Sequence, residues 1–289
     1  MIQPSVTSRG SMFADDRNIH RVFQEMFCVQ DIAESLPSFD DTADGEHVKR
    51  VMDAKGLEVV GIRQNGVIAG YAEQSDLRSS CCRDVMRPLA DAQVVADTLP
   101  LAALILRLKD QSRLFVLAFG QISGIVDRGD IQKPPGRMWL FGMITILEMR
   151  FSRMIEQLCP GDSWKGYLST GRLEKAHQLL ALRQSRNQQP SLADCLQFAD
   201  KTAIIARNTH LRSLTRFRSK REIEEIGKQL ENLRNSLAHS QDIVANDWET
   251  IVALAEQLDS VLDGPPGNST GEQKISNANA ACNYDGQPQ

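Results

Sequence analysis

Two stretches of the chain repeat each other, and this duplication constrains the fold more than any other feature of the sequence. Each stretch has a helical pattern followed by two β-rich segments that flank a glycine-containing turn. Two glycines and an aspartate recur at a constant spacing of 54 residues: Gly66, Gly70 and Asp76 in the first stretch, Gly120, Gly124 and Asp130 in the second. The sequence therefore predicts an internal duplication of one small unit that contains a helix and a hairpin.

The first stretch predicts a helix over 46–54 and strands over 57–62 and 67–72. Its turn, Asn65-Gly66, is typical of two-residue β-hairpins, because both residues adopt positive φ readily. A tight hairpin is therefore expected.

The second stretch predicts the same order of elements, with a helix over 101–109 and strands over 114–119 and 122–126. Before the duplication, a mixed helical pattern covers 18–36. Residues 1–17 show little pattern, so we expect them to form a flexible arm.

Both copies end in a segment that resembles the CBS motif, Gly-Tyr-Ala-Glu-Gln-Ser-Asp-Leu at 70–77 and Gly-Ile-Val-Asp-Arg-Gly-Asp-Ile at 124–131. The segment Asp84-Val85-Met86-Arg87-Pro88 is similar to the connector usual between two such motifs. The resemblance covers about residues 20–132 and implies a tandem CBS domain over 18–132. Domains of this family commonly bind adenine nucleotides or related adenosyl ligands.

The resemblance implies a ligand site with two glycines and two aspartates: Gly70, Asp76, Gly124 and Asp130. In the family the aspartate often contacts ribose hydroxyls, and a Ser or Thr three residues earlier often contacts phosphate or ribose. This chain has Glu73 and Asp127 at those earlier positions. A carboxylate repels phosphate, so an adenosine-type or positively charged adenosyl ligand is less hindered than a multiply phosphorylated one. Two alternatives stay open: the aspartates cap turns, or the sites are empty.

A break at Lys133-Pro134-Pro135-Gly136 predicts a domain boundary. Beyond it, helical patterns cover five segments: 138–158, 170–186, 191–217, 220–239 and 247–262. The tail over 263–289 is rich in Gly, Asn, Ser and Gln, which predicts disorder. The expected fold is an α+β pair of two βαβ-like repeats, followed by an all-α helical bundle over 136–262.

The fourth predicted helix has one apolar stripe and a polar end. Its apolar residues recur at steps of three and four: Ile223, Ile226, Leu230, Leu233 and Leu237. Ser219 followed by Glu222 is a capping box that starts the helix. The stripe faces a core or a partner, and we consider that its end packs against a second copy of the chain in a homodimer.

The polar end, Arg234-Asn235-Ser236-Leu237-Ala238-His239, is similar to the signature of HEPN domains. These are small helical bundles, and many are metal-independent ribonucleases that act as dimers. The resemblance covers about residues 136–262 and implies that Arg234, Asn235 and His239 are catalytic. The alternative is a solvated helix end, where a cation interacts with the helix dipole.

The chemistry of RNA cleavage suits these residue types. The 2′-hydroxyl of RNA can attack the adjacent phosphate without a metal, and histidine has a pKa suited to the base and the acid of this reaction. Arginine stabilises the charge that develops on the phosphorane. Asn235 lies four residues before His239, so it could orient the imidazole or bind phosphate. The expected products are a 2′,3′-cyclic phosphate and a 5′-hydroxyl, with no cofactor or metal for catalysis.

Positive charge is concentrated before the motif. Residues 1–131 contain 14 Lys/Arg and 19 Asp/Glu, whereas the remainder contains 19 and 18. Residues 201–221 contain seven basic residues and no acid. Five of them form the predicted RNA-binding track: Lys201, Arg207, Arg212, Arg216 and Arg218. The alternative is a solvated face, or arginines that bond to carbonyls at helix ends.

The remaining features limit the functional class. The six cysteines show no paired C-x-x-C spacing, so we expect neither zinc nor a disulfide framework. The N-terminus lacks an apolar run and no segment predicts a membrane span, so we expect a cytoplasmic protein. Together the resemblances imply a ribonuclease gated by an adenosyl ligand, in stress, toxin or phage-defence roles with a possible antitoxin. The alternative is a nucleotide-sensing adaptor that binds RNA or protein without cutting it.

Overall fold

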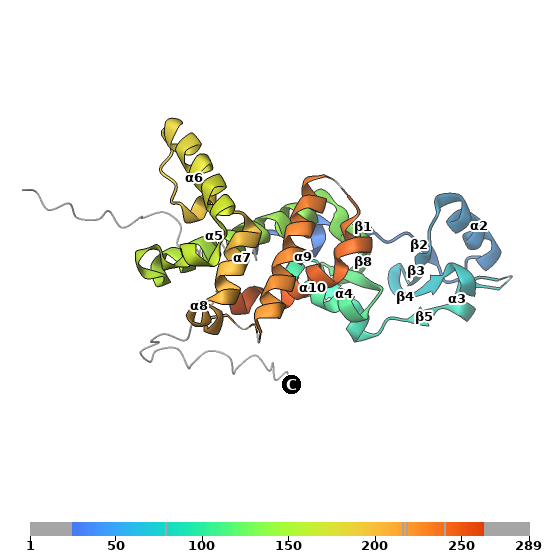
Figure 1. Ribbon diagram of the computed structural model, residues 1–289. Coiled ribbons are helices and arrows are strands. Elements are labelled where there is room, and N and C mark those ends of the chain that lie inside the picture. Colours follow the sequence, from blue (N-terminus) through green and yellow to red (C-terminus); the bar gives the residue numbers. More distant parts are fainter. Residues whose placement is uncertain (1–24, 79, 216, 218, 240, 263–289) are drawn as a thin grey trace, which may run out of the picture.

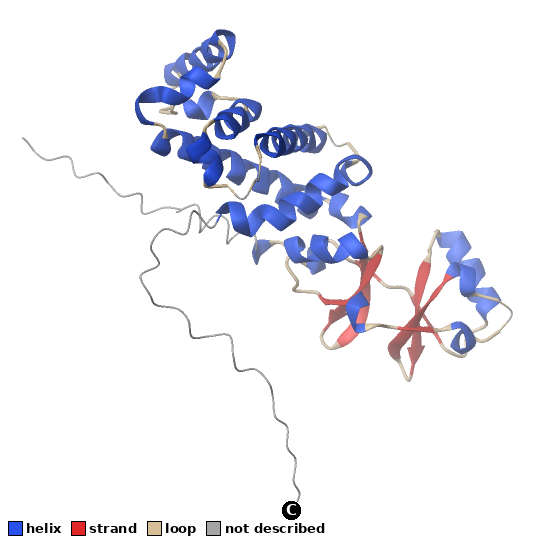
Figure 2. Cartoon of the chain, turned by 60° about the horizontal axis from the view of Figure 1, so that its bottom comes forward, coloured by secondary structure: helices blue, strands red, loops and turns tan. Residues whose placement is uncertain are grey.

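The computed structural model describes residues 25–262, except 79, 216, 218 and 240 (Figure 1). Two sheets lie at one end of the molecule, and helices form the rest (Figure 2). The predicted flexible arm over 1–17 and the predicted disordered tail over 263–289 lie outside the described residues. Within the described residues, no helix is long and apolar enough to span a bilayer.

The first repeat is a βαβ unit that continues into a hairpin. Its elements in chain order are β2 (Ser38–Asp40), α2 (Gly45–Lys55), β3 (Val59–Gln64) and β4 (Val67–Glu73). Strand β2 pairs with β3 in parallel, and β3 pairs with β4 in antiparallel fashion. Helix α2 starts where the Asp44 carboxylate accepts a hydrogen bond from the N–H of His47, and it ends at the left-handed Gly56.

The second repeat has the same elements: β6 (Val94–Ala96), α4 (Leu101–Asp110), β7 (Arg113–Ala118) and β8 (Gln121–Asp127). Strand β6 pairs with β7 in parallel, and β7 pairs with β8 in antiparallel fashion. Both hairpin turns have positive φ at two residues, Asn65-Gly66 and Phe119-Gly120. The register shifts in each hairpin at equivalent points, after Ile62 and after Val116. The predicted duplication into two βαβ repeats is confirmed.

Short strands are exchanged between the repeats. Strand β1 (Glu34–Ser35) precedes the first repeat but pairs with β8, and β5 (Arg87–Pro88) precedes the second repeat but pairs with β4. The sheets therefore have the orders β2-β3-β4-β5 and β1-β8-β7-β6. The helix predicted over 18–36 is wrong from residue 27 onward. There the chain forms the 3-10 turn η1 (Val29–Asp31) and β1, because pairing with a distant strand overrides the local helical pattern.

The predicted ligand-site glycines lie where these exchanged strands approach. A Cβ atom at Gly70 would lie 2.5 Å from the carbonyl oxygen of Arg87, and one at Gly124 would lie 3.0 Å from that of Glu34. The close backbone approach of an edge strand therefore explains both glycines. Their recurrence reflects packing inside each sheet.

Six helices form the second half of the chain within the described residues: α5 (Pro134–Leu158), α6 (Thr170–Ser185), α7 (Phe198–Arg207), α8 (Thr209–Ser213), α9 (Lys220–Ala238) and α10 (Ile243–Leu262). A 3-10 segment, η5 (Pro160–Tyr167), joins α5 to α6. The helix predicted over 191–217 is wrong, because it begins at Phe198 and breaks at Asn208, whose side chain caps α8. Helix α10 begins four residues before its predicted start, because Asp242 accepts hydrogen bonds from two N–H groups of its first turn.

The hydrophobic cores divide the molecule differently from the predicted boundary. The first repeat has a small core of its own around Val48, Met52 and Ile62. The second repeat shares one continuous core with the helices, in which Leu104 of α4 and Trp139 of α5 are both fully buried. Helix α5 does begin in the predicted break, with Pro134 in its first turn. The break therefore starts a helix and does not separate two cores. The first repeat lies farther from the bundle than the second repeat does (Figure 1).

Candidate functional site

The end of α9 that contains the motif is anchored by burial of the apolar stripe. Ile223, Leu230, Leu233 and Leu237 are buried in the core of their own chain. The suggestion that this stripe packs against a second copy is therefore wrong. The large apolar side chains that stay exposed on neighbouring α5 include Met138, Phe141 and Met149. The homodimer stays a prediction, and this face of α5 is its candidate surface.

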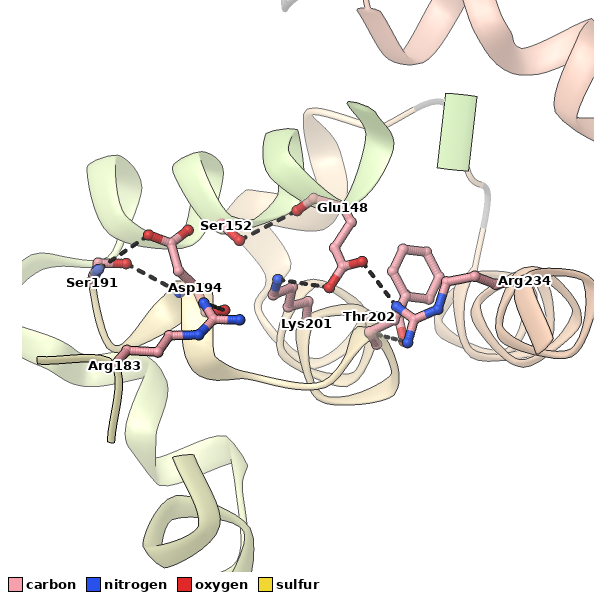
Figure 3. Close-up of polar contacts among 9 residues, drawn as sticks. Glu148, Ser152, Arg183, Ser191, Asp194, Lys201, Thr202 and Arg234 are labelled. Atoms are coloured by element: carbon pink, nitrogen blue, oxygen red, sulfur yellow. Dashed lines mark hydrogen bonds and ion pairs between the residues drawn. The ribbon is translucent and has the colours of Figure 1, made fainter. Parts of the chain in front are cut away.

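Arg234 points toward α5, where it meets a partly buried acid (Figure 3). Its Nη1 lies 3.0 Å from Oε2 of Glu148, while Nζ of Lys201 lies 3.1 Å from Oε1 of the same carboxylate. The Lys201 side chain is only 3% exposed, whereas that of Arg234 is 37% exposed. Glu148 therefore neutralises one buried cation and fixes a second one at the surface.

Lys201 is thus a correction to the predicted RNA-binding track. Its ammonium group is buried in the bundle and paired with Glu148, so it is not available to a phosphate from the surface. The sequence placed it in a basic run, but α7 is buried on nearly all sides, so that the consecutive Asp200, Lys201 and Thr202 are all buried.

The other members of the track bond to helix ends or are not described. Arg207 is exposed and donates to the carbonyl oxygen of Tyr167 at 2.6 Å. Arg212 donates to the carbonyl oxygen of Ala206 at 2.9 Å. Arg216 and Arg218 lie outside the described residues. Arg207 is exposed and Arg212 is half-buried, and the hydrogen bonds of both match the helix-end alternative.

Asn235 and His239 lie on the exposed side of α9. His239 is the C-cap residue, and its N–H donates to the carbonyl oxygen of Asn235 at 3.0 Å. On a regular helix these two positions are about 40° apart, whereas Arg234 and His239 are about 140° apart. The structure brings the three predicted catalytic residues to one helix end, with Arg234 turned toward α5 and the other two toward solvent.

Asp76 closes the first repeat. One carboxylate oxygen accepts a hydrogen bond from the N–H of Glu73 at 3.1 Å, and the other lies 2.7 Å from Nη2 of Arg87. Arg87 also lies 3.2 Å from Glu73. Burial alone would raise the pKa of Asp76, but the hydrogen bonds from Arg87 and from the Glu73 N–H lower it below its ordinary value.

Asp130 closes the second repeat in the same way as Asp76 closes the first, but its side chain is more deeply buried. Its carboxylate accepts a hydrogen bond from the N–H of Asp127 at 2.7 Å and lies 2.6 Å from Nζ of Lys133. Lys133 also reaches Glu34 at 2.9 Å and the carbonyl oxygen of Ile32 at 2.7 Å. Burial raises the pKa of Asp130, although the bond from Lys133 opposes the rise. Both aspartates are therefore capping residues, in agreement with the first alternative, and each has a cation as its partner.

The residues that come after Asp130 hold the end of α9. Arg137, in the first turn of α5, donates from Nη2 to the carbonyl oxygens of Ser236 and Leu237, each at 3.0 Å. The same guanidinium donates from Nη1 to the carbonyl oxygen of Gln241 at 3.0 Å. These carbonyls lie at and beyond a helix C-terminus, where a cation is favourable.

Gln132 makes a second connection to the same turn. Its amide nitrogen donates to Asp242 at 2.9 Å, and its oxygen accepts from the N–H of Ile243 at 3.3 Å. We call Gln132 and Arg137 the clamp. The clamp joins the segment that begins at Asp130 to both sides of the turn that contains His239.

No family model matches this sequence, and no curated protein matches it. Solved structures do. The N-terminal part of the chain is similar to CBS-domain pair proteins. One is a CBS domain-containing protein of unknown function from Bacillus anthracis, with 16% identity over 39% of this chain and 95% of that chain, at a TM-score of 0.35.

Two others contain ligands. The CBS domain of a bacterial CNNM/CorC family Mg2+ transporter in complex with ATP has 18% identity over 40% of this chain and 91% of that chain, at a TM-score of 0.32. CbpB in complex with c-di-AMP has 16% identity over 41% of this chain and 89% of that chain, at a TM-score of 0.35.

The site contains three residues whose partners the sequence did not predict. Glu148 stands out in the sequence only as an acid in an apolar helix, which indicates a satisfied core group, and its partner Arg234 is distant in sequence. Lys133 is the first residue of the predicted break and Arg137 follows its last residue, and in the sequence both look like ordinary surface cations. Contacts across about 100 residues leave no local pattern that could have found them.

Proposed function

We propose that the protein is a metal-independent ribonuclease whose activity responds to an adenine nucleotide bound by the second repeat. The observation that supports this proposal most is the clamp. Arg137 bonds to the carbonyls of Ser236 and Leu237, which lie inside the predicted catalytic motif, and it stands only seven residues after Asp130. A candidate ligand site and a candidate catalytic site are thereby joined by one short segment.

The catalytic chemistry assigns one role to each residue of the motif. His239 takes the proton of the 2′-hydroxyl or gives one to the 5′ leaving oxygen, which its exposure at the end of α9 permits. Arg234 stabilises the phosphorane, and its pairing with Glu148 fixes the guanidinium before substrate arrives. Asn235 shares the exposed face with His239 and positions the imidazole or a phosphate oxygen.

The regulatory step follows from competition at Asp130. Its carboxylate is occupied by Lys133, the residue that precedes α5. Ribose hydroxyls that bind this carboxylate must displace or share the ammonium group of Lys133. Any movement of Lys133 is passed to the first turn of α5, and through Arg137 to the end of α9. The sequence resemblance gives the ligand class. ATP and c-di-AMP, present in the similar structures, are to be tested beside adenosine, which lacks the phosphate that Asp127 would repel.

Cleavage of RNA by the purified full-length chain tests the activity. His239→Ala should lower the rate by about 10²–10⁴-fold, the usual contribution of a general acid–base group. Arg234→Ala should lower it by about 10²–10³-fold, as for the loss of one group that stabilises the transition state. Products should end in 2′,3′-cyclic phosphate and 5′-hydroxyl groups, and EDTA should have no effect. The proposal is contradicted if EDTA stops the cleavage, or if the His239→Ala variant cleaves RNA at the wild-type rate.

A second candidate is a nucleotide-sensing adaptor that binds RNA or protein without cleavage. The ion pair between Arg234 and Glu148 favours it, because a partly buried salt bridge is also a structural role for this arginine. Under this alternative Arg234→Ala destabilises the bundle, whereas His239→Ala changes nothing. The exposed His239 therefore distinguishes the two candidates better than Arg234 does.

A further inference from the structure

A cavity of about 490 Å³ lies beside α9, on the N-terminal side of the motif. It is formed between α7, α9 and the chain from the end of η5 to the first turn of α6. The two helices touch at Gly227, where a Cβ atom would lie within 2.7 Å of the side chain of Thr202. This close contact holds α7 and α9 together, and the cavity opens beside it. Its volume is in the range of small-molecule sites.

Its lining contains the three kinds of group that recognise a nucleotide. Tyr167 lines the cavity and is packed against the bundle core while staying partly exposed, so the exposed part of its ring can stack on a base. Arg172, Arg207 and Lys228 supply cations for phosphate, and Glu224 and Glu231 supply acceptors for the amino groups of base edges. Two carboxylates make the lining unfavourable for a compact polyanion. An apolar molecule would remove solvent from five charged groups without offering any of them a new partner.

Two of the cations are held in place by the fold. Arg172 is paired with Asp200, whose side chain is 4% exposed. Arg207 donates to the carbonyl oxygen of Tyr167, which fixes its guanidinium against the backbone at the end of η5. Lys228, by contrast, is exposed on α9. A site with its charges already positioned loses less entropy when it binds.

The cavity is aligned with the candidate catalytic residues. On α9, Glu224, Glu231 and Asn235 are spaced by seven and four residues, so they share one face. At 1.5 Å per residue, Glu231 lies about 6 Å and Lys228 about 10 Å before Asn235 along the helix axis. A single strand that passes along this face therefore reaches the cavity and the end of α9 in succession.

We propose that the cavity binds a nucleotide of single-stranded RNA that neighbours the cleaved one. This inference rests on the proposed function for the position of cleavage, but binding in the cavity can be measured without cleavage. The base stacks on Tyr167 and is held at its edge by Glu224 or Glu231. Lys228 and Arg172 bind the adjoining phosphates.

Fluorescence anisotropy with a labelled single-stranded RNA tests this site, using the full-length chain with His239→Ala so that the RNA stays intact. Tyr167→Ala should raise Kd by roughly 5- to 100-fold, the usual effect of removing one stacking ring, and Tyr167→Phe should restore binding. Lys228→Gln should reduce the slope of log K against log salt by about 0.7, as for one phosphate contact on a single strand. The matched control Lys55→Gln, an exposed lysine at the end of α2, should leave the slope unchanged.

The outcomes separate this inference from the proposed function. If Tyr167→Ala and Lys228→Gln bind RNA like the parent while the wild type cleaves RNA, the cavity assignment is overturned and the ribonuclease stands. If the variants lose RNA binding while the wild type never cleaves, the cavity assignment stands and the ribonuclease does not. Free CMP, whose base has the amino group that the carboxylates would accept from, tests the source of the nucleotide. If CMP displaces RNA at concentrations equal to those of the RNA itself, and only when Tyr167 is present, the site is a mononucleotide site and the strand assignment is overturned.

Discussion

The two repeats have the same hairpin, the same bulge and the same capping aspartate, but they differ in their surroundings. The first repeat encloses its own small core, and Asp76 is paired with Arg87 on an edge strand of the same sheet. The second repeat shares its core with the helices, and Asp130 is paired with Lys133, the residue before α5. Under the proposed function, a ligand at the first aspartate would disturb one sheet. A ligand at the second would disturb the start of α5, the helix against which α7 and α9 pack.

A duplicated unit can thus acquire two roles without changing its own architecture. The hairpin geometry is retained because it depends on turns and glycines within each repeat. The consequence of binding differs because it depends on the element that succeeds each capping aspartate along the chain. After Asp76 the chain continues to the short helix α3 (Cys82–Val85), and after Asp130 it continues to α5 and the clamp. We therefore expect the second repeat to regulate and the first to contribute mainly affinity or structure.

Core substitutions should separate the repeats with the largest effect. Leu104→Ala removes a fully buried side chain from the shared core and should lower the free energy of unfolding of the bundle by about 2–5 kcal/mol. Met52→Ala should cost a similar amount, but only in the first repeat, because Met52 lies in the separate core. Hydrogen exchange resolved by segment measures both. Equal loss of protection in α9 for the two variants would show that the cores are not independent.

Replacing each aspartate by alanine should show which repeat only binds the nucleotide and which repeat also regulates RNA cleavage. Asp130→Ala should abolish the effect of the nucleotide on RNA cleavage, an effect that allosteric coupling usually makes about 5- to 150-fold. Asp76→Ala should retain that effect, even where it weakens the increase in melting temperature that the ligand causes. Cleavage rates at saturating and zero ATP measure the first quantity, and thermal unfolding measures the second. If Asp76→Ala abolishes the effect of the nucleotide and Asp130→Ala keeps it, the first repeat regulates cleavage and the second does not.

The two aspartates should make stability depend on pH with opposite signs. This is the smallest of the three expected differences between the repeats. The folded-state pKa of Asp76 is lowered, so its contribution is present above the unfolded pKa and is lost as pH falls. The folded-state pKa of Asp130 is raised, so its contribution is present below the unfolded pKa and is lost as pH rises through the folded value. Asp76→Asn should therefore be most destabilising near neutral pH, whereas the cost of Asp130→Asn should grow as pH falls toward about 4. Melting temperatures of both variants across this range measure the difference, and parallel profiles would contradict it.

The sequence predicted the repeats well because their signals are local. Asn65-Gly66, the alternation around it and the spacing to Gly120 specify each hairpin within a few residues. It predicted α9 for the same reason, from a regular apolar stripe and the cap at Ser219. The exchanged strand β1 could not be predicted because its partner β8 lies about 90 residues away, and two residues are too few to show a period.

The site was predicted less completely, because its electrostatics depend on distant partners. Lys201 has the pattern of a surface cation, but the fold of α7 turns it toward Glu148. Arg137 has no distinguishing pattern in the sequence, and only the packing of α9 against α5 gives it a role. A pattern along one helix shows which residues share a face, but it does not show which element covers that face.

We expect a ligand bound at Asp130 to affect the end of α9 through the clamp, and this coupling can be measured directly. The quantity is the ratio of RNA cleavage rates with and without saturating ATP, in the wild type, in Arg137→Met and in the control Arg107→Met, an exposed arginine on α4. We predict that Arg137→Met brings the ratio close to one while the rise in melting temperature with ATP persists, and that Arg107→Met keeps the wild-type ratio. A wild-type ratio in Arg137→Met, with ATP still bound, would show that the clamp does not couple the two sites.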